Sequence, residues 1–312
     1  MSWTAFDIPD QAGRVAVVTG ANGGLGFESA RELARKGAHV VMAARNQAKA
    51  DNARAAILAE IPDASLEIVP LDLGSLASVE AAAQAIRNGH LRVDVLINNA
   101  GIMAVPQGAT ADGFEIQFGT NHLGHFALTA RLMPTLVAAD AARVVTITST
   151  ARHFGRPVDP ANPNLHGKYD PWRAYGQSKL ANLYFAVELQ RRLAQAGSTV
   201  LSLVAHPGLS DTDLQATSVQ NTGGGSSQKF FHWLAGTTGM SPAQGALPGL
   251  RAATDPAASG GELYAPRFVN TGPPVRRPLL RRSTNRQAAA TLWEVSQQQT
   301  GITFDVAALV RG

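Results

Sequence analysis

Short apolar runs recur through the first two-thirds of the chain, and each has the length and composition of a buried strand. They occupy residues 15–19, 40–44, 66–71, 93–97, 144–148 and 200–204. Amphipathic segments with a helical period lie between them, at residues 28–36, 48–60, 76–87, 126–138 and 178–194. This alternation predicts an α/β fold with a doubly wound parallel sheet, because each parallel return needs a right-handed crossover. Ligands of such a sheet bind at the carboxyl ends of its strands.

Two stretches interrupt the alternation. Residues 155–171 carry four prolines, which is typical of an excursion loop. Residues 209–242 hold three consecutive glycines and then an apolar patch formed by Phe230, Phe231, Trp233 and Leu234. We expect a substrate lid there, hinged at the glycines, and the alternative is a static helix packed against the sheet or in an oligomer interface.

A single domain is expected over residues 1–312, since α/β folds of this size commonly form one core. Its parts are a cofactor-binding and catalytic core at 14–208, the lid at 209–242 and a C-terminal part at 243–312.

The chain contains no cysteine, which excludes disulfides, thiolate metal sites and cysteine nucleophiles. Residues 1–13 lack a basic stretch leading into an apolar run, and no apolar run reaches the roughly 18 residues that a membrane-spanning helix needs. We therefore expect a cytoplasmic protein with no membrane span and no signal peptide.

The net charge of +4 is partly local, because six arginines crowd a late, proline-rich stretch: Arg267, Arg276, Arg277, Arg281, Arg282 and Arg286. Such a cluster can attract anionic surfaces or nucleic acid. No nucleic-acid-binding motif accompanies it, so we expect a solvated surface and no nucleic-acid partner. A homo-oligomer stays open.

A glycine-rich segment, Thr19 to Gly26, directly follows the first predicted strand and opens a helix. Glycines at positions 20, 24 and 26 let the backbone turn tightly and approach a pyrophosphate, while the helix N-terminus supplies amides and a positive dipole. The context of a preceding strand and a following helix favours a dinucleotide site in a Rossmann-type sheet.

The end of the second strand distinguishes the two nicotinamide cofactors. An NAD site usually places a carboxylate there, but this chain has Arg45, which suits a 2′-phosphate. We therefore expect NADP(H), with NAD(H) as the alternative. Asp72, after the third strand, is placed to accept from the adenine amine, or else to cap the helix that begins near Ser75.

Four polar residues are expected at the carboxyl edge of the sheet: Ser149 after the fifth strand, Tyr175 and Lys179 four apart on one helix face, and Asn121. An ordinary tyrosine, with a pKa of about 10, is too weak a base to remove a proton from an alcohol. An adjacent ammonium lowers that pKa, so this pair makes a proton shuttle, and Ser149 would polarise the substrate oxygen.

These segments resemble the motifs of short-chain dehydrogenases/reductases. Thr19 to Gly26 is similar to their T-G-x-x-x-G-x-G, Asn98 to Gly101 to their N-N-A-G, and Tyr175 to Lys179 to their Y-x-x-x-K. His206-Pro207-Gly208 with Thr212 resembles the segment that contacts the nicotinamide end. The matches keep the family's order and extend over residues 14 to about 212, around two-thirds of the chain.

The resemblance implies hydride transfer between NADP(H) and a carbonyl or alcohol substrate, with a catalytic set of Asn121, Ser149, Tyr175 and Lys179. In the family the backbone carbonyl of the asparagine helps to hold a water, and the lysine contacts the nicotinamide ribose. The expected cofactor-binding residues are Gly20, Asn22, Gly24, Leu25, Gly26, Arg45, Asp72, Leu73, Asn98, Asn99, Ala100, Gly101, Thr148, Tyr175, Lys179, Pro207, Gly208 and Thr212.

Within the family, the chain resembles the retinol-dehydrogenase-like and protochlorophyllide-reductase-like branch, through segments such as Asn121 to Phe126 and Ser178 to Asn182. Light-driven pigment reduction is associated with an active-site cysteine, which this chain lacks. The missing membrane anchor argues against a retinoid substrate. We expect an apolar substrate, chosen by residues 150–172 and 209–242.

Other residues allow three further interpretations. His122 and His125 are three apart, but no third ligand is evident, so we expect packing or hydrogen-bonding histidines and no catalytic metal. A serine hydrolase is disfavoured because the chain has no G-x-S-x-G elbow. The remaining alternative is a non-catalytic NADP(H)-binding sensor or scaffold with the same fold.

Overall fold

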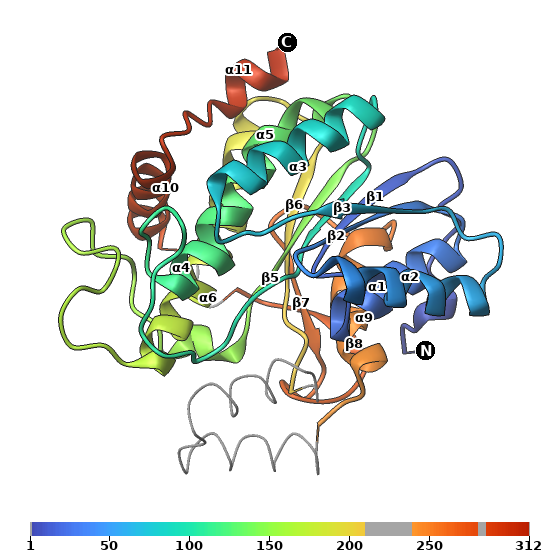
Figure 1. Ribbon diagram of the computed structural model, residues 1–312, viewed down its shortest axis with the longest axis horizontal. Coiled ribbons are helices and arrows are strands. Elements are labelled where there is room, and N and C mark those ends of the chain that lie inside the picture. Colours follow the sequence, from blue (N-terminus) through green and yellow to red (C-terminus); the bar gives the residue numbers. More distant parts are fainter. Residues whose placement is uncertain (1, 210–238, 280–284, 312) are drawn as a thin grey trace.

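One sheet organises the protein. The computed structural model describes residues 2–209, 239–279 and 285–311, and in them the strands form an eight-stranded sheet of order β3-β2-β1-β4-β5-β6-β7-β8 (Figure 1). All neighbouring strands are parallel except β7 and β8. The strands are β1 (Val15–Thr19), β2 (His39–Ala44), β3 (Leu66–Pro70), β4 (Val95–Asn98), β5 (Arg143–Ile147), β6 (Leu201–Ala205), β7 (Leu263–Pro266) and β8 (Pro274–Arg277). The strand order reverses between β1 and β4, which is where a doubly wound sheet binds its ligand.

Helices cover both faces of the sheet (Figure 1). One face carries α1 (Gly24–Arg35), α2 (Gln47–Glu60) and α9 (Pro242–Thr254). The other carries α3 (Leu76–Gly89), α5 (Gly124–Val137) and α6 (Pro171–Gln195), with α10 (Arg286–Thr300) and α11 (Val306–Arg311) packed outside them. The short helices are η1 (Ala5–Asp7), α4 (Ile116–Phe118), η2 (Gly119–Leu123) and η3 (Thr150–His153). The α/β, doubly wound sheet predicted from the apolar runs is confirmed.

All six predicted strands and all five predicted helices are present, with boundaries that differ by a few residues. The largest error concerns α6, which begins at Pro171 rather than near Ser178. Asp170 caps this helix by accepting from the amide of Arg173 at 2.7 Å, and proline is well suited to the first helical position. Residues 210–238 of the predicted lid lie outside the described residues.

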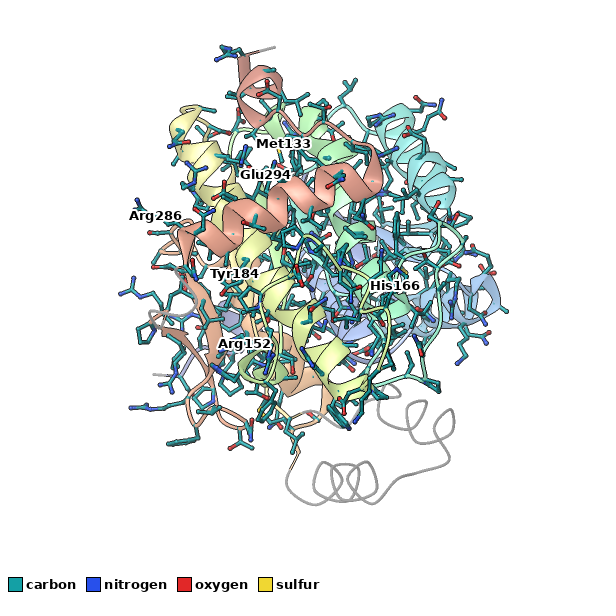
Figure 2. The ribbon with its side chains drawn as sticks, turned by 90° about the vertical axis from the view of Figure 1, so that its left-hand side faces the viewer. Met133, Arg152, His166, Tyr184, Arg286 and Glu294 are labelled. Atoms are coloured by element: carbon teal, nitrogen blue, oxygen red, sulfur yellow. The ribbon has the colours of Figure 1, made fainter. Side chains whose placement is uncertain are left out.

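The C-terminal part is held to the core by aromatic packing. Trp293 of α10 lies 5.3 Å from Phe126 of α5, 6.0 Å from Phe185 of α6 and 4.9 Å from Phe304, between ring centroids. Figure 2 looks onto α10, which crosses in front of α6. Among the described helices, none combines the length and apolar character needed to cross a bilayer.

Replacing Trp293 by alanine should lower the free energy of unfolding by about 3–5 kcal/mol, because the side chain is only 2% exposed and its removal leaves a cavity. Urea denaturation measures this change. Phe6→Ala is the matched control, since Phe6 is 92% exposed and should cost little. An equal loss in both variants would contradict the assignment of α10 to the core.

Candidate active site

The turn after β1 requires glycine at two positions. Gly20 has a φ of 69°, in the left-handed region, and a Cβ there would lie 3.1 Å from the Cα of Ala100. A Cβ on Gly26 would overlap the carbonyl oxygen of Gly20. The two glycines thus let the head of α1 pack against the turn, as the glycine pattern predicts.

The N-terminus of α1 is open to an anion. Its N-cap residue, Gly23, has no side chain to accept from the first amides, so those donors keep their capacity for an external acceptor. Gly24 and Leu25 lie in the first turn of this 12-residue helix, and Asn22 lies in the turn before it. The cradle therefore fits the pyrophosphate of a dinucleotide.

Thr19 joins this turn to the loop after β4. Its hydroxyl accepts from the backbone amides of Asn99 and Ala100, both at 2.9 Å, and the Asn99 side chain donates to the Thr19 carbonyl at 2.8 Å. Asn98 differs from its neighbours, because its side chain is fully buried and donates to Thr129 of α5 at 3.0 Å. Its side chain therefore has a packing role, and only its backbone lies at the strand end.

Ser149 and Tyr175 meet at the end of β5. Ser149 accepts from the amide of Ala151 at 3.2 Å and so caps η3, and its hydroxyl lies near enough to Tyr175 to lower the pKa of the phenol. The capping contact of Ser149 is therefore compatible with the catalytic role predicted for it. Burial raises the pKa of Tyr175 to about 12, against a lowering contribution from Ser149.

Lys179 lies one turn further along α6. Its ammonium is 5.8 Å from the centroid of the Tyr175 ring and donates to the carbonyl of Ile147 at 3.4 Å. Burial lowers the pKa of Lys179 to about 8. Thr148 fixes this part of α6 by donating to the Lys179 carbonyl at 2.7 Å.

Gly101 brings the loop after β4 close to Lys179 and Asn121. A Cβ on this residue would lie 3.3 Å from Nζ of Lys179 and 3.0 Å from Oδ1 of Asn121. The four predicted catalytic residues and the predicted nucleotide loops are therefore brought to one edge of the sheet.

Asn121 lies in η2, a single turn of π-helix. Its side chain is fixed at both ends, since Oδ1 accepts from the amide of Ile102 at 2.8 Å and Nδ2 donates to the Ile102 carbonyl and to Ser178 Oγ, both at 2.9 Å. A π-helical turn inside a helix often marks a functional position, because it changes how the backbone carbonyls are directed.

His125 links Asn121 to the nucleotide turn. Its Nδ1 donates to the Asn121 carbonyl at 2.9 Å, so in the neutral ring Nε2 accepts a hydrogen bond from the Thr19 hydroxyl at 2.9 Å. Burial lowers the pKa of His125 to about 4, which keeps the ring neutral. The sequence predicted only a packing or hydrogen-bonding histidine here, and the structure confirms that and adds its two partners.

His122 faces elsewhere. Its Nε2 lies 2.7 Å from Ser296 Oγ of α10, and its ring stacks on Phe118 with centroids 5.2 Å apart. His122 and His125 therefore have separate protein partners, as the packing interpretation predicts.

The remaining cofactor candidates lie around this edge. Arg45 is exposed directly after β2, and no ion pair or hydrogen bond involves its side chain among the described residues. Ser75 caps α3 by accepting from the amide of Ser78, so the alternative that Asp72 caps this helix is wrong. Asp72 accepts instead from Gly74 at 2.9 Å.

Beyond Asp72, Leu73 is buried, with its carbonyl against Gly124. Pro207 and Gly208 follow β6, and Gly208 has a φ of 77° and packs against Asn270. Thr212 lies outside the described residues.

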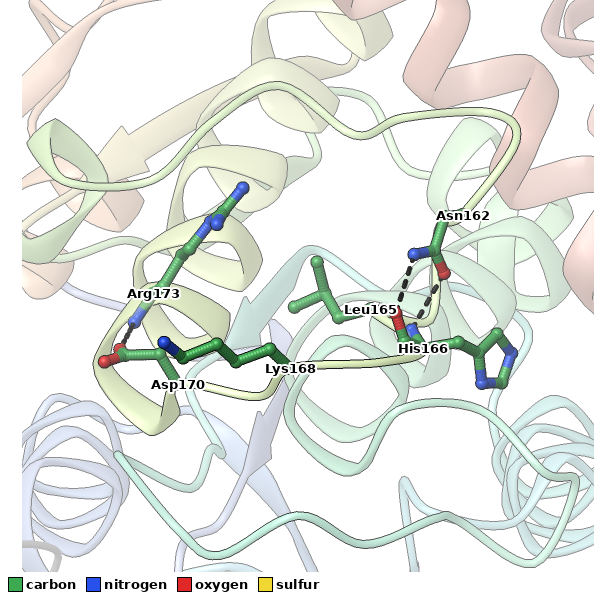
Figure 3. A pocket seen from close by; sticks show the side chains of 6 residues that line it. All are labelled: Asn162, Leu165, His166, Lys168, Asp170 and Arg173. Atoms are coloured by element: carbon green, nitrogen blue, oxygen red, sulfur yellow. Dashed lines mark hydrogen bonds between the residues drawn. The ribbon is translucent and has the colours of Figure 1, made fainter.

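The excursion loop forms a small hollow of about 140 Å³ at the head of α6 (Figure 3). Its lining is mostly polar and consists of Asn162, Leu165, His166, Lys168, Asp170 and Arg173. This part of the loop therefore offers a polar surface rather than the apolar wall expected of a substrate pocket.

The comparisons with known proteins agree with this geometry. The family model described as short chain dehydrogenase matches residues 14–223, which is more than half of the chain. The chain belongs to the short-chain dehydrogenase family. Its α/β sheet with the glycine turn after β1 is the architecture of that family, and the oxidoreductase class is shown by the family together with its named relatives.

Two curated human relatives indicate the branch. The chain is 36% identical to polyprenol dehydrogenase from Homo sapiens over 94% of this chain and 87% of that protein. It is 43% identical to human retinol dehydrogenase 13 over 65% of this chain and 60% of that protein. The resemblance to the retinol-dehydrogenase-like branch is thereby confirmed.

A solved structure supports the fold over nearly the whole chain. An uncharacterized protein from Mycobacterium paratuberculosis is 43% identical and superposes with a TM-score of 0.80, covering 97% of this chain and 99% of the other. This match agrees with a single α/β domain.

Stability should fall steeply as the pH drops from about 6 to 5. Burial lowers the pKa of His122 and His206 to about 3 and that of His125 to about 4, so all three stay neutral when folded. In the unfolded chain these histidines have a pKa near 6.5, so in this pH range the unfolded state binds about three more protons than the folded state. The free energy of unfolding therefore decreases by about 3–4 kcal/mol per pH unit.

Urea denaturation at a series of pH values measures this slope. His122→Phe keeps a ring in place and should reduce the slope by about one-third, whereas His166→Phe, at an exposed position, should not change it. Identical slopes in all three proteins would show that His122 is not the origin of the pH dependence.

Proposed function

We propose that the protein transfers a hydride between NADP(H) and an apolar alcohol or carbonyl compound, using Asn121, Ser149, Tyr175 and Lys179. The observation that supports this most directly is the convergence of Ser149, Tyr175 and Lys179 beside Gly101, at the edge of the sheet that also carries the open N-terminus of α1.

The residues divide the chemistry between them. A bound nicotinamide supplies or accepts the hydride at carbon. Ser149 donates a hydrogen bond to the substrate oxygen, and the Tyr175 hydroxyl gives that oxygen its proton in carbonyl reduction. The buried phenol, with its pKa near 12, is fully protonated at neutral pH and so is ready as the proton donor.

Lys179 acts on the reverse step. Alcohol oxidation needs the phenolate of Tyr175, and a protonated lysine near the ring stabilises that anion. The Lys179 ammonium is already 5.8 Å from the ring centroid, but burial is the dominant influence on both groups in this structure. The lowering of the tyrosine pKa that the sequence predicts is therefore not found, because burial outweighs it and Lys179 does not contribute to the shift.

NADP(H) is favoured over NAD(H) by the residue after β2. Arg45 is exposed, with no partner among the described residues, so its guanidinium can bind a 2′-phosphate in bidentate fashion. The adjacent side chain of Asn46 is engaged in capping α2, where it accepts from Lys49 at 2.9 Å. No carboxylate follows β2 directly to repel the phosphate.

The substrate class is supported by the relatives. Polyprenol and retinol, in the names of the human relatives, are both isoprenoid alcohols. We therefore propose a primary alcohol or aldehyde on an extended apolar chain as the substrate of this protein, which also agrees with the apolar segment at 230–234.

Tyr175→Phe should reduce kcat for carbonyl reduction by about 100-fold or more, because an acid/base group contributes at least this much. NADPH affinity, followed by fluorescence titration, should stay within a few-fold of the wild-type value, since the hydroxyl acts in proton transfer. Tyr264→Phe, which removes a hydroxyl bonded to Glu262, is the control. A Tyr175→Phe enzyme with more than about a tenth of the wild-type rate would refute the assignment.

Arg45→Asp should reverse the cofactor preference, raising the Kd of NADPH relative to that of NADH by about 100-fold. The substitution removes a phosphate partner and adds a carboxylate that repels phosphate but accepts from ribose hydroxyls. Titration with both cofactors measures the ratio, and Arg286→Asp at the start of α10 is the matched charge control. Wild-type protein that binds NADH as tightly as NADPH would disprove the role of Arg45.

A further inference from the structure

Three metal-ligating side chains meet at the edge of the sheet opposite the proposed active site. They come from separate elements, since His39 opens β2, Glu67 lies in the adjacent strand β3, and His90 follows the last turn of α3. All three are half-buried. Among the described residues, this is where three such groups come close enough to share an ion.

Their donor atoms converge on one point. Oε2 of Glu67 lies 2.8 Å from Nε2 of His90 and 3.4 Å from Nε2 of His39, and all three atoms lie within 4.8 Å of one another. The two imidazole rings are tilted by 45° with centroids 5.0 Å apart, so they are not stacked on each other. Both rings therefore direct Nε2 toward the same carboxylate oxygen.

The orientation of His39 is set from its other side. Its Nδ1 lies 2.7 Å from Oγ of Ser65. A metal-bound histidine commonly uses its second ring nitrogen in such a hydrogen bond, which fixes the ring and leaves the first nitrogen free for the ion. Ser65 would fill that supporting position here.

We propose that His39, Glu67 and His90 bind a divalent ion of the zinc type. Two imidazole nitrogens and one carboxylate oxygen form a donor set that zinc accepts, and a water completes its coordination. With ligands about 2.0–2.2 Å from the ion, tetrahedral zinc holds its donor atoms about 3.3 Å apart. The 3.4 Å separation of Glu67 and His39 already fits, and binding requires His90 to exchange its hydrogen bond to Glu67 for a bond to the metal.

The site would be structural. The ion would join the start of β2 and β3 to the end of α3. From this site β2 runs six residues, or about 20 Å, to Arg45 in the proposed cofactor site. Zinc binding is therefore separable from cofactor binding and catalysis.

Isothermal titration of chelator-treated, full-length protein with ZnCl₂ tests the site. We expect one tight equivalent with a Kd of about 1 μM or below, together with a rise in the melting temperature that EDTA reverses. His39→Ala and His90→Ala should each weaken this equivalent at least tenfold, and Glu67→Gln should also weaken it. His166→Ala, which removes an exposed histidine from the excursion loop, should leave it unchanged.

Cobalt gives an independent readout, because tetrahedral Co²⁺ with nitrogen and oxygen ligands absorbs visible light more strongly than octahedral Co²⁺. The wild-type protein should show this absorption and the His90→Ala protein should not. An absence of tight binding in the wild type, or equal Zn²⁺ affinity in the wild type and in the His39 and His90 variants, would overturn the proposal. The three residues would then be a hydrogen-bonded cluster only.

Discussion

The hydroxyl of Thr19 holds the two halves of the active-site edge together. It accepts from two amides of the loop after β4 and donates to His125, which in turn binds the carbonyl of Asn121. One oxygen thus joins the glycine turn, the loop that carries Gly101, and the π-helical turn. The positions of Lys179 and Tyr175 relative to the nucleotide cradle depend on this connection, because Gly101 packs against both Asn121 and Lys179.

Burial gives this edge its electrostatic character. Lys179 is only 5% exposed and Tyr175 only 8%, and desolvation favours the neutral form of each. His125 is kept neutral for the same reason, and a second cation beside Lys179 is thereby avoided. Of these three groups, Lys179, with a pKa of about 8, is the one that titrates closest to neutral pH.

Much of this arrangement could be predicted from the sequence because it is carried by contiguous motifs. The glycine turn, the residues after β4 and the Tyr175/Lys179 pair are each defined within eight residues, and the apolar runs determine the order of the strands that bring them together. Helix α9 was missed because its sequence contains two prolines and two glycines, which are typical of turns. Strands β7 and β8 have only four residues each, too few to show a period.

Contacts between distant residues could not be predicted. The bond of His125 to Thr19 spans 106 positions, and the cluster at His39 joins residues 28 and 23 positions apart that share no spacing motif. The raised pKa of Tyr175 was also missed, since it depends on how completely the folded chain covers the ring.

The outer strands of the sheet have a consequence for association between molecules. Parallel sheets end in strands whose outward amides and carbonyls could pair with another chain. Here β3 ends at Pro70, which has no amide to donate, and carries Glu67, while β8 begins at Pro274 and carries Arg276 and Arg277. Proline and charge at both borders discourage strand-by-strand stacking of one molecule on the next, so the sheet is protected from growing into a fibre.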